Sequence, residues 1–264
     1  MQIIRDIAAL RMARSSLGGT VAVVPTMGAL HAGHMKLVET AKHHADHVIA
    51  TIFVNPTQFA PTEDLSRYPR READDAALLA QAGVAILWAP TVTTMYPDGF
   101  ATSIAVAGVS EGLCGASRPG HFVGVATVVN KLFAQVRPDV ALFGEKDWQQ
   151  LQVIRRMVAD LDMGITIVGV PIEREADGLA LSSRNAYLLP SERASAVALP
   201  HSLQAAALAL ERGEKEAETL DRARADITAA GFSIDYVERC GDRILAAARI
   251  GSTRLIDNFP IMSR

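Results

Sequence analysis

The spacing of apolar residues predicts strands that alternate with helices up to about residue 171. Short β-branched and apolar runs, typical of buried parallel strands, are followed by longer amphipathic segments. The predicted strands are residues 20–24, 48–54, 84–88, 140–143 and 165–170. The predicted helices are residues 2–16, 33–45, 71–82, 122–136 and 149–161. This alternation predicts an α/β fold, a Rossmann-like parallel sheet with helices on both faces.

Beyond about Pro171 the pattern changes to long alanine-rich helices, predicted over residues 191–212 and 216–230. Short apolar runs follow and predict strands at residues 234–237, 244–250 and 254–256. We therefore expect two domains. Residues 1–171 form the Rossmann-like domain, and residues 172–264 form a smaller C-terminal α+β domain.

Composition narrows the classes of function. The 264 residues are 49% hydrophobic and 21% charged, which is enough apolar material for a real core. A net charge of −3 and 5% aromatic residues argue against a nucleic-acid partner. The two cysteines, Cys114 and Cys240, are too few for a disulfide scaffold and are expected to be reduced. No apolar run reaches the roughly 18–20 residues that span a bilayer, and residues 1–19 lack a signal-peptide pattern. We expect a soluble intracellular protein with no membrane partner.

The loop after the first long strand carries the strongest candidate site, because open parallel sheets bind ligands at the carboxyl ends of their strands. It reads PTMGALHAGH over residues 25–34, and a helix begins at its end. A helix start offers free N–H groups and a partial positive charge, which suit phosphate, and Gly33 lets the backbone approach a ligand closely. His31 and His34 lie three residues apart, so both imidazoles could donate hydrogen bonds to phosphoryl oxygens.

Two other interpretations of these histidines stay open: a turn with two solvated side chains, and a metal site shared with histidines downstream. His43, His44 and His47 are expected on an exposed face at the far end of the same helix. That end lies roughly 15 Å away at about 1.5 Å per residue, so the two groups would not converge easily.

Three further loops carry polar residues suited to a nucleotide or a small acid. Gln58 offers both a donor and an acceptor to a substrate with hydroxyl and carboxylate groups, although a polar turn explains it equally well. After residue 143, Gly144 gives backbone access, Lys146 suits phosphate and Asp147 suits ribose hydroxyls. Gln150 could share a face with Asp147. A capped helix with a surface ion pair is the alternative there.

The fourth loop has two hydroxyls and a guanidinium, in Ser182, Ser183 and Arg184. It could close over a triphosphate, although such a loop is often only a connection. The chain contains neither a P-loop nor a G-x-G-x-x-G fingerprint, and no zinc spacing or G-x-S-x-G elbow.

Together these segments resemble one family over the whole chain. The matching motifs are PTMGALHAGH (25–34), FVNPTQF (53–59), RPGHF (118–122), FGEKD (143–147), LSSRN (181–185) and TRLIDN (253–258). In this order they are similar to the pantothenate synthetase (pantoate–β-alanine ligase) family of the H-x-G-H nucleotidylyltransferase superfamily. The H-x-G-H motif alone would indicate only the superfamily.

The resemblance implies an enzyme that condenses pantoate with β-alanine to give pantothenate, AMP and pyrophosphate. ATP is a substrate, and Mg²⁺ is bound mainly through the phosphates. A pantoyl adenylate forms first, and the amine of β-alanine then attacks it. The family also implies a cytoplasmic homodimer formed by the N-terminal domain.

The family's site residues carry over to matching positions. The implied ATP-binding residues are Met27, Gly28, Ala29, Leu30, His31, Ala32, Gly33, His34, Gly144, Glu145, Lys146, Asp147, Glu173, Leu181, Ser182, Ser183 and Arg184. His34 matches the catalytic histidine, and His31, Lys146 and Arg184 are expected to stabilise phosphoryl charge with it. Gln58 and Gln150 match glutamines that hold pantoate, with Gln58 near β-alanine. Glu173 matches a backbone contact to adenine. No protein ligand for a metal is expected.

Two positions depart from the family pattern. Thr57 stands where methionine is common, beside Gln58. The connection at residues 239–243 is shorter than the pattern, which bears on the sheet of the smaller domain and not on the site motifs.

Three other functions remain to be separated from this one. An H-x-G-H nucleotidylyltransferase would leave the nucleotide on its product. A nucleotide-binding regulatory module would bind ATP without turnover. A nucleic-acid-binding relative of synthetase catalytic domains is disfavoured by the net charge of −3.

Overall fold

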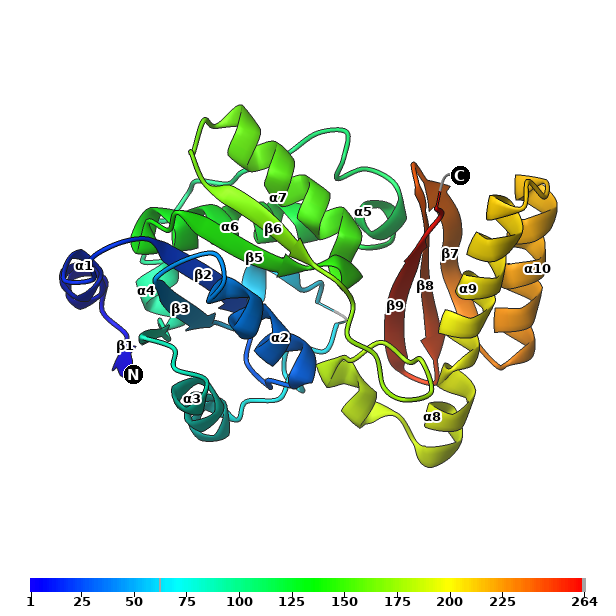
Figure 1. Cartoon of the computed structure of the whole chain (residues 1–264), viewed down its shortest axis with the longest axis horizontal. Coiled ribbons are helices and arrows are strands. Elements are labelled where there is room, and N and C mark those ends of the chain that lie inside the picture. Colours follow the sequence, from blue (N-terminus) through cyan, green and yellow to red (C-terminus); the bar gives the residue numbers. More distant parts are fainter. Residues whose placement is uncertain (62, 263–264) are drawn as a thin grey trace. The chain divides into compact units, whose positions relative to one another are not determined.

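A six-stranded sheet forms the centre of the first part of the chain (Figure 1). The computed structural model describes residues 1–61 and 63–262. The strands are β1 (Gln2–Ile4), β2 (Val21–Thr26), β3 (His47–Ile52), β4 (Ile86–Trp88), β5 (Val140–Gly144) and β6 (Thr166–Val170). Their order is β1-β4-β3-β2-β5-β6, and every neighbouring pair is parallel.

This strand order reverses between β2 and β5. From β2 the chain continues to β3 and β4 on one side, and it returns to β5 and β6 on the other. Such a reversal opens a crevice at the carboxyl ends of the two strands, where open α/β sheets bind their ligands. The loops that follow β2 and β5 therefore lie at the expected binding position.

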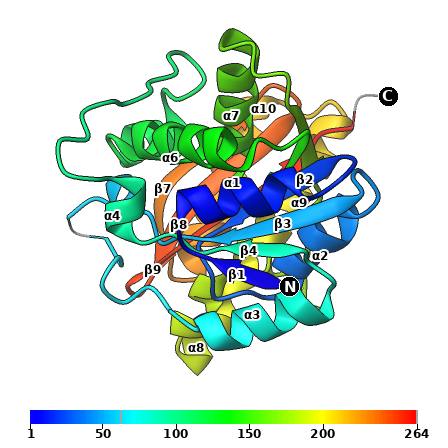
Figure 2. The same cartoon turned by 90° about the vertical axis from the view of Figure 1, so that its left-hand side faces the viewer.

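Helices cover both faces of the sheet (Figures 1 and 2). They are α1 (Ile7–Ser15), α2 (Ala32–Ala41), α3 (Glu72–Gln81), α4 (Val92–Met95), α5 (Leu113–Ser117), α6 (His121–Val136) and α7 (Trp148–Asp160). Helices α2 and α3 pack on one face, where Leu37, Val38 and Leu79 join the buried strand residues. Helices α6 and α7 lie over the other face, with α1 packed beside α6. The predicted α/β fold is confirmed.

The predicted helix over residues 2–16 is wrong at its start. Residues Gln2–Ile4 form β1, which pairs with β4, and only Ile7–Ser15 are helical. Asp6 caps the helix, because its carboxylate accepts the Ala9 N–H at 2.9 Å. The apolar run at Ile3 and Ile4 fits either element, and a pairing partner more than 80 residues away decides between them.

The second part of the chain has an antiparallel sheet and three helices. Its order is β7-β8-β9, with β7 (Ser233–Cys240), β8 (Arg243–Ile250) and β9 (Thr253–Pro260). The helices are α8 (Pro190–Ala196), α9 (Ala198–Glu211) and α10 (Glu216–Ala229). Leu199, Leu203 and Ile227 of the helices pack with Val237 and Ile244 of the sheet. The smaller α+β fold is therefore confirmed.

Two local features of this part differ from the expected pattern. The predicted helix 191–212 is interrupted at Val197, because Pro200 has no N–H to donate to the Ala196 carbonyl. The short segment 239–243 does not disturb the sheet. Cys240 pairs directly with Arg243, and Gly241 takes a φ of +63° in the tight turn between them.

The chain divides into two units, one of Met1–Glu145 with Gln149–Pro171, the other of Lys146–Trp148 with Ile172–Arg264. Residues 146–148 thus follow β5 in sequence but belong with the second unit.

In the first unit, a buried carboxylate holds the loop between β2 and α2. Asp75 of α3 is 2% exposed, and its two oxygens accept the N–H groups of Ala29 and Leu30, each at 2.8 Å. The loop needs this support because Gly28 and Ala29 have φ values of +81° and +52°. A Cβ at Gly28 would lie 3.0 Å from Asp75 Oδ2, so glycine also permits the close approach.

In the second unit, the end of β9 holds two separate segments. Asp257, with 1% of its side chain exposed, makes a bidentate pair with Arg174 at 2.7 and 2.9 Å. Arg174 also donates to the Gly178 carbonyl at 3.0 Å, which ties down the turn before Leu179. Asn258 donates to the Lys146 carbonyl at 3.1 Å. Burial raises the pKa of Asp257, and Arg174 opposes this shift.

We predict that Asp75→Ala lowers the free energy of unfolding by about 1–3 kcal/mol, because two loop N–H groups lose a charged acceptor. Hydrogen exchange at the amides of Ala29 and Leu30 should accelerate in the same variant. The matched control is Asp74→Ala, which removes an exposed carboxylate from the same helical turn. Equal effects of the two substitutions would show that helix charge, and not the loop contact, is responsible.

We predict that Asp257→Asn lowers the free energy of unfolding by about 3 kcal/mol, because the Arg174 guanidinium loses the charge of its buried partner. Thermal and urea unfolding measure this change. Asp242→Asn makes the same substitution at an exposed turn position and should change stability by less than about 0.5 kcal/mol. An Asp257→Asn protein as stable as the Asp242→Asn protein would contradict an anchoring role for the pair.

Candidate active site

Two imidazoles cap the N-terminus of α2. His31 is the N-cap residue, and its Nδ1 accepts the Gly33 N–H at 3.2 Å. In return, Nδ1 of His34 accepts the His31 N–H at 3.3 Å. The two rings lie close together, with centroids 4.1 Å apart. The three-residue spacing thus forms a reciprocal cap at the start of the helix.

This cap determines which ring nitrogen carries the proton. A nitrogen that accepts an N–H is unprotonated, so each neutral imidazole carries its hydrogen on Nε2. Both side chains therefore present an Nε2–H donor from a helix end with partial positive charge. Such a pair suits an oxygen-rich anion.

The backbone of the loop after β2 differs from expectation. The sequence predicts free N–H groups at the helix start, yet the Gly33 N–H there and several N–H groups of the loop before it have acceptors within the protein. The Gly28 N–H donates to Thr26 Oγ1 at 3.1 Å, and the N–H groups of Ala29 and Leu30 donate to Asp75. The His31 N–H donates to the His34 ring, and the Gly33 N–H donates to the His31 ring. The physical reason is that a loop with positive φ values needs its own hydrogen bonds to keep its shape.

A buried asparagine orients the side chain of Gln58 in the loop after β3. Asn55 is 1% exposed, and its Oδ1 accepts from Thr57 N, Thr57 Oγ1 and Tyr96 Oη at 3.3, 2.9 and 2.8 Å. Its Nδ2 donates to the Gly124 carbonyl at 3.2 Å and to Gln58 Oε1 at 3.0 Å. The backbone N–H of Thr57 can only donate, so the orientation of both amides follows.

The loops after β2 and β3 meet at this glutamine. Gln58 Nε2 lies 3.3 Å from Met27 Sδ, a weak acceptor. The Nε2–H groups of Gln58 are thus directed toward the loop that carries His31 and His34. The structure thus brings Gln58 into contact with Met27, two residues that the sequence interpretation placed in separate segments.

The segment after β5 contributes residues to both units. Gly144 ends β5, and Glu145 begins the 3₁₀ turn Glu145–Asp147. Gln150 is half-buried near the start of α7. Its neighbour Gln149 is buried and structural, because it accepts the Cys114 N–H at 3.0 Å and donates to the carbonyls of residues 109, 111 and 112.

In the second unit, the remaining candidate residues lie on two supported segments. Lys146 Nζ lies 3.8 Å from Asp147 Oδ2, and the Lys146 carbonyl is held by Asn258. The Glu173 carbonyl accepts the Leu181 N–H at 2.9 Å. Ser182 caps the turn Ser183–Tyr187 by accepting the Arg184 N–H at 3.2 Å. The serine–arginine segment is therefore a capped 3₁₀ turn.

The sequence predicted that the downstream histidines lie on an exposed helix face, and this prediction is wrong. Helix α2 ends at Ala41, so His43 and His44 are exposed on the following turn, and His47 begins β3, at the end of the strand away from the carboxyl-end loops. Among the described residues, no group of three or more His, Cys, Asp or Glu side chains could hold a metal ion. Within residues 1–61 and 63–262, no helix is long and apolar enough to span a membrane.

The sequence interpretation missed the residues that support the site. Asp75 had a detectable signal, because it lies four positions before the buried Leu79 and so on the apolar face of its helix. Asn55 precedes a proline, a pattern typical of a turn in which the asparagine side chain caps the next N–H groups. Arg118 and His121 lie in the R-P-G-H-F motif and Asp257 in T-R-L-I-D-N, but their partners Glu63, Gln58 and Arg174 are 55, 63 and 83 positions away, so the sequence did not show what they contact.

Comparisons with known proteins identify the family of the chain. The family model for pantoate-β-alanine ligase matches residues 2–260. A curated pantothenate synthetase from Sphingopyxis alaskensis is 60% identical, covering 99% of this chain and 100% of its own. The crystal structure of pantothenate synthetase from Thermus thermophilus has 46% identity and a TM-score of 0.94, with 99% of both chains covered.

A third relative was solved with ligands. The pantoate-β-alanine ligase from Francisella tularensis, complexed with β-γ ATP and β-alanine, is 36% identical to this chain. Its TM-score is 0.90, and the match covers 99% of this chain and 98% of that one. The chain therefore belongs to the pantoate–β-alanine ligase family and is an enzyme, a ligase that forms pantothenate.

Proposed function

We propose that the enzyme condenses pantoate with β-alanine through a pantoyl-adenylate intermediate, with ATP as the second substrate. The observation that supports this proposal is the contact of Gln58 with Met27, which joins the loop after β3 to the loop that leads to His31 and His34. The Nε2–H groups of His31 and His34 suit phosphate, and those of Gln58, 3.3 Å from Met27, suit the oxygens of a small acid. Adenylation needs both groups in one place.

In the first step, a carboxylate oxygen of pantoate attacks the α-phosphorus of ATP. The new P–O bond forms as the bond to the β,γ-diphosphate breaks, and pyrophosphate leaves with that electron pair. No base is needed, because the carboxylate is already the nucleophile. Negative charge spreads over the phosphoryl oxygens, and we assign its stabilisation to His31, His34, Lys146 and Arg184.

In the second step, the neutral amine of β-alanine attacks the acyl carbon. The C–O bond to phosphate breaks, AMP leaves with its electrons, and the amine loses one proton. Gln58 and Gln150 are assigned to pantoate, which they would hold through both steps. The nucleotide contacts are assigned to Met27–His34, Gly144–Asp147, Glu173 and Leu181–Arg184.

Mg²⁺ is assigned to the phosphates of ATP, where it would neutralise charge before transfer. The imidazole nitrogens of His31 and His34 are not ligands that Mg²⁺ prefers. The family membership also leads us to propose a cytoplasmic homodimer formed through the first unit.

The two-step scheme predicts where the oxygen of the carboxylate goes. With pantoate labelled with ¹⁸O in its carboxylate, we expect one labelled oxygen in AMP, and unlabelled pyrophosphate as the other product derived from ATP. Without β-alanine, pyrophosphate should still form, limited to about one per active site if the adenylate stays bound. Mass spectrometry of AMP and a rapid-quench assay of pyrophosphate measure both.

Other products would overturn the proposal. Label in inorganic phosphate together with ADP would indicate an acyl phosphate. A nucleotide retained on the final product would indicate a nucleotidylyltransferase, and ATP binding without turnover would indicate a regulatory module.

For His34, we predict that His34→Asn lowers the rate of adenylate formation by roughly 10²–10³, as expected for one lost charge-stabilising donor. Asparagine retains a hydrogen-bond acceptor for the His31 N–H, so the helix cap is kept. It lacks the Nε2–H group, so the donor to the phosphoryl oxygens is lost. Amide formation from supplied pantoyl adenylate should continue, because the phosphate is then only a leaving group. An equal loss in both half-reactions would contradict this role.

A further inference from the structure

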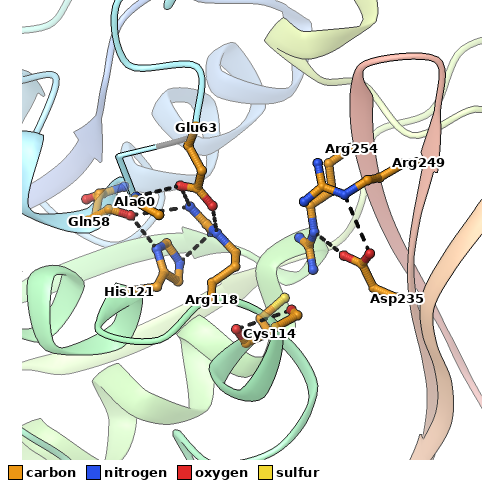
Figure 3. A network of polar contacts seen from close by, with 10 residues as sticks. Gln58, Ala60, Glu63, Cys114, Arg118, His121, Asp235, Arg249 and Arg254 are labelled. Atoms are coloured by element: carbon orange, nitrogen blue, oxygen red, sulfur yellow. Dashed lines mark hydrogen bonds and ion pairs between the residues drawn. The ribbon is translucent and has the colours of Figure 1, made fainter.

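Arg118 and His121 of the R-P-G-H-F motif both contact the backbone carbonyl of Gln58 (Figure 3). Arg118 donates from Nε and Nη2 to the two carboxylate oxygens of Glu63, at 2.6 and 2.8 Å. Its Nη1 lies 2.9 Å from His121 Nε2. His121 Nδ1 in turn lies 2.9 Å from the Gln58 carbonyl, which Arg118 Nη2 also reaches at 3.3 Å. We call Glu63, Arg118 and His121 the carbonyl clamp.

The clamp has one consistent arrangement of protons. A guanidinium can only donate, so His121 Nε2 is the acceptor of the Arg118 bond. A neutral His121 then carries its hydrogen on Nδ1, and this N–H donates to the Gln58 carbonyl. That carbonyl therefore accepts two hydrogen bonds, one from an imidazole and one from a cation.

The clamp is shielded from solvent, so these bonds are not the exposed kind that water readily replaces. His121 is 9% exposed, and the side chains of Arg118 and Glu63 are 13% and 16% exposed. Burial raises the pKa of Glu63, but the hydrogen bonds and charge of Arg118 outweigh burial and lower it overall. Glu63 also accepts the Ala60 N–H at 3.2 Å, two residues beyond Gln58.

The loop that carries Gln58 needs outside support. Pro56–Gln58 is a single 3₁₀ turn, closed by the Phe59 N–H on the Pro56 carbonyl at 3.3 Å. Helix α6 lies directly against it, since a Cβ at Gly124 would come within 2.4 Å of the Thr57 carbonyl. Asn55 orients the side-chain amide of Gln58, and the clamp fixes the main chain from which that side chain extends.

We propose that Arg118 and His121, with Glu63 behind them, are positioning residues that fix Gln58 for pantoate and so determine the affinity for this substrate. This inference rests on the proposed function, because it takes Gln58 as a pantoate ligand. A loop ordered before the substrate arrives does not lose that conformational entropy on binding. The clamp thus acts on pantoate through Gln58 and not on ATP.

The test compares His121→Phe with His121→Asn. Asparagine places an N–H donor near the former Nδ1 and retains the bond to the Gln58 carbonyl, whereas phenylalanine retains the ring but not the donor. We expect His121→Phe to raise the KM for pantoate about tenfold, the effect of one lost hydrogen bond. The KM for ATP should change less than about twofold, and His121→Asn should restore most of the pantoate affinity. A purely packing role predicts the reverse order, because phenylalanine fills the space better.

A double-mutant cycle shows whether His121 acts through Gln58. In a Gln58→Ala background, His121→Phe should have no further effect on the KM for pantoate. A persisting effect would overturn the proposal, because His121 would then act on the substrate by another route. If His121→Phe fails to fold, Arg118→Lys can replace it in the same cycle with Gln58→Ala. Lysine retains the charge of Arg118 but not its forked geometry. His43→Phe makes the same exchange at an exposed turn and serves as the matched control.

The two possible failures are distinguishable. If Gln58→Ala leaves the KM for pantoate unchanged, the assignment of Gln58 in the proposed function is wrong, and the clamp proposal falls with it. If Gln58→Ala raises this KM but His121→Phe does not, the proposed function stands and the clamp proposal is overturned.

Discussion

Backbone polar groups in the loops beyond the parallel strands have no ladder partners, and the site depends on how these groups are satisfied. In this protein, charged or amide side chains from distant segments supply many of the missing partners. Asp75 binds N–H groups 45 and 46 residues before it. His121 reaches a carbonyl 63 residues earlier, and Asn258 reaches one 112 residues earlier. Each of these anchors is itself buried or nearly so.

Such anchoring determines the loop shape when the protein folds, before any ligand binds. A loop with positive φ values, such as Gly28–Ala29, would otherwise relax to a more favourable backbone conformation. Holding it costs stability elsewhere in the chain but leaves the donors of His31, His34 and Gln58 already oriented. Preorganised donors stabilise developing charge without reorganising at the moment of reaction, which is the usual source of their catalytic effect.

The sequence predicted the sheet, most helices and the loops of the site, because these follow from local periodicity and from the rule that ligands bind beyond parallel strands. It failed where a distant partner decided the outcome. Residues Gln2–Ile4 became a strand through pairing with β4. The contacts that hold the loops were not predicted for the same reason, since a contact such as Arg174 with Asp257 joins residues 83 positions apart.

The orientation of the Asn55 and Gln58 amides follows from one backbone group that can only donate a hydrogen bond. The Thr57 N–H must donate, so Asn55 presents its oxygen to that group and its nitrogen to Gln58. Gln58 Oε1 is then the acceptor in this contact, and the Gln58 Nε2–H groups face Met27 Sδ. A reversed Gln58 amide would place two donors face to face at 3.0 Å. The Nε2–H groups of Gln58 suit the oxygens of carboxylates, hydroxyls and phosphates.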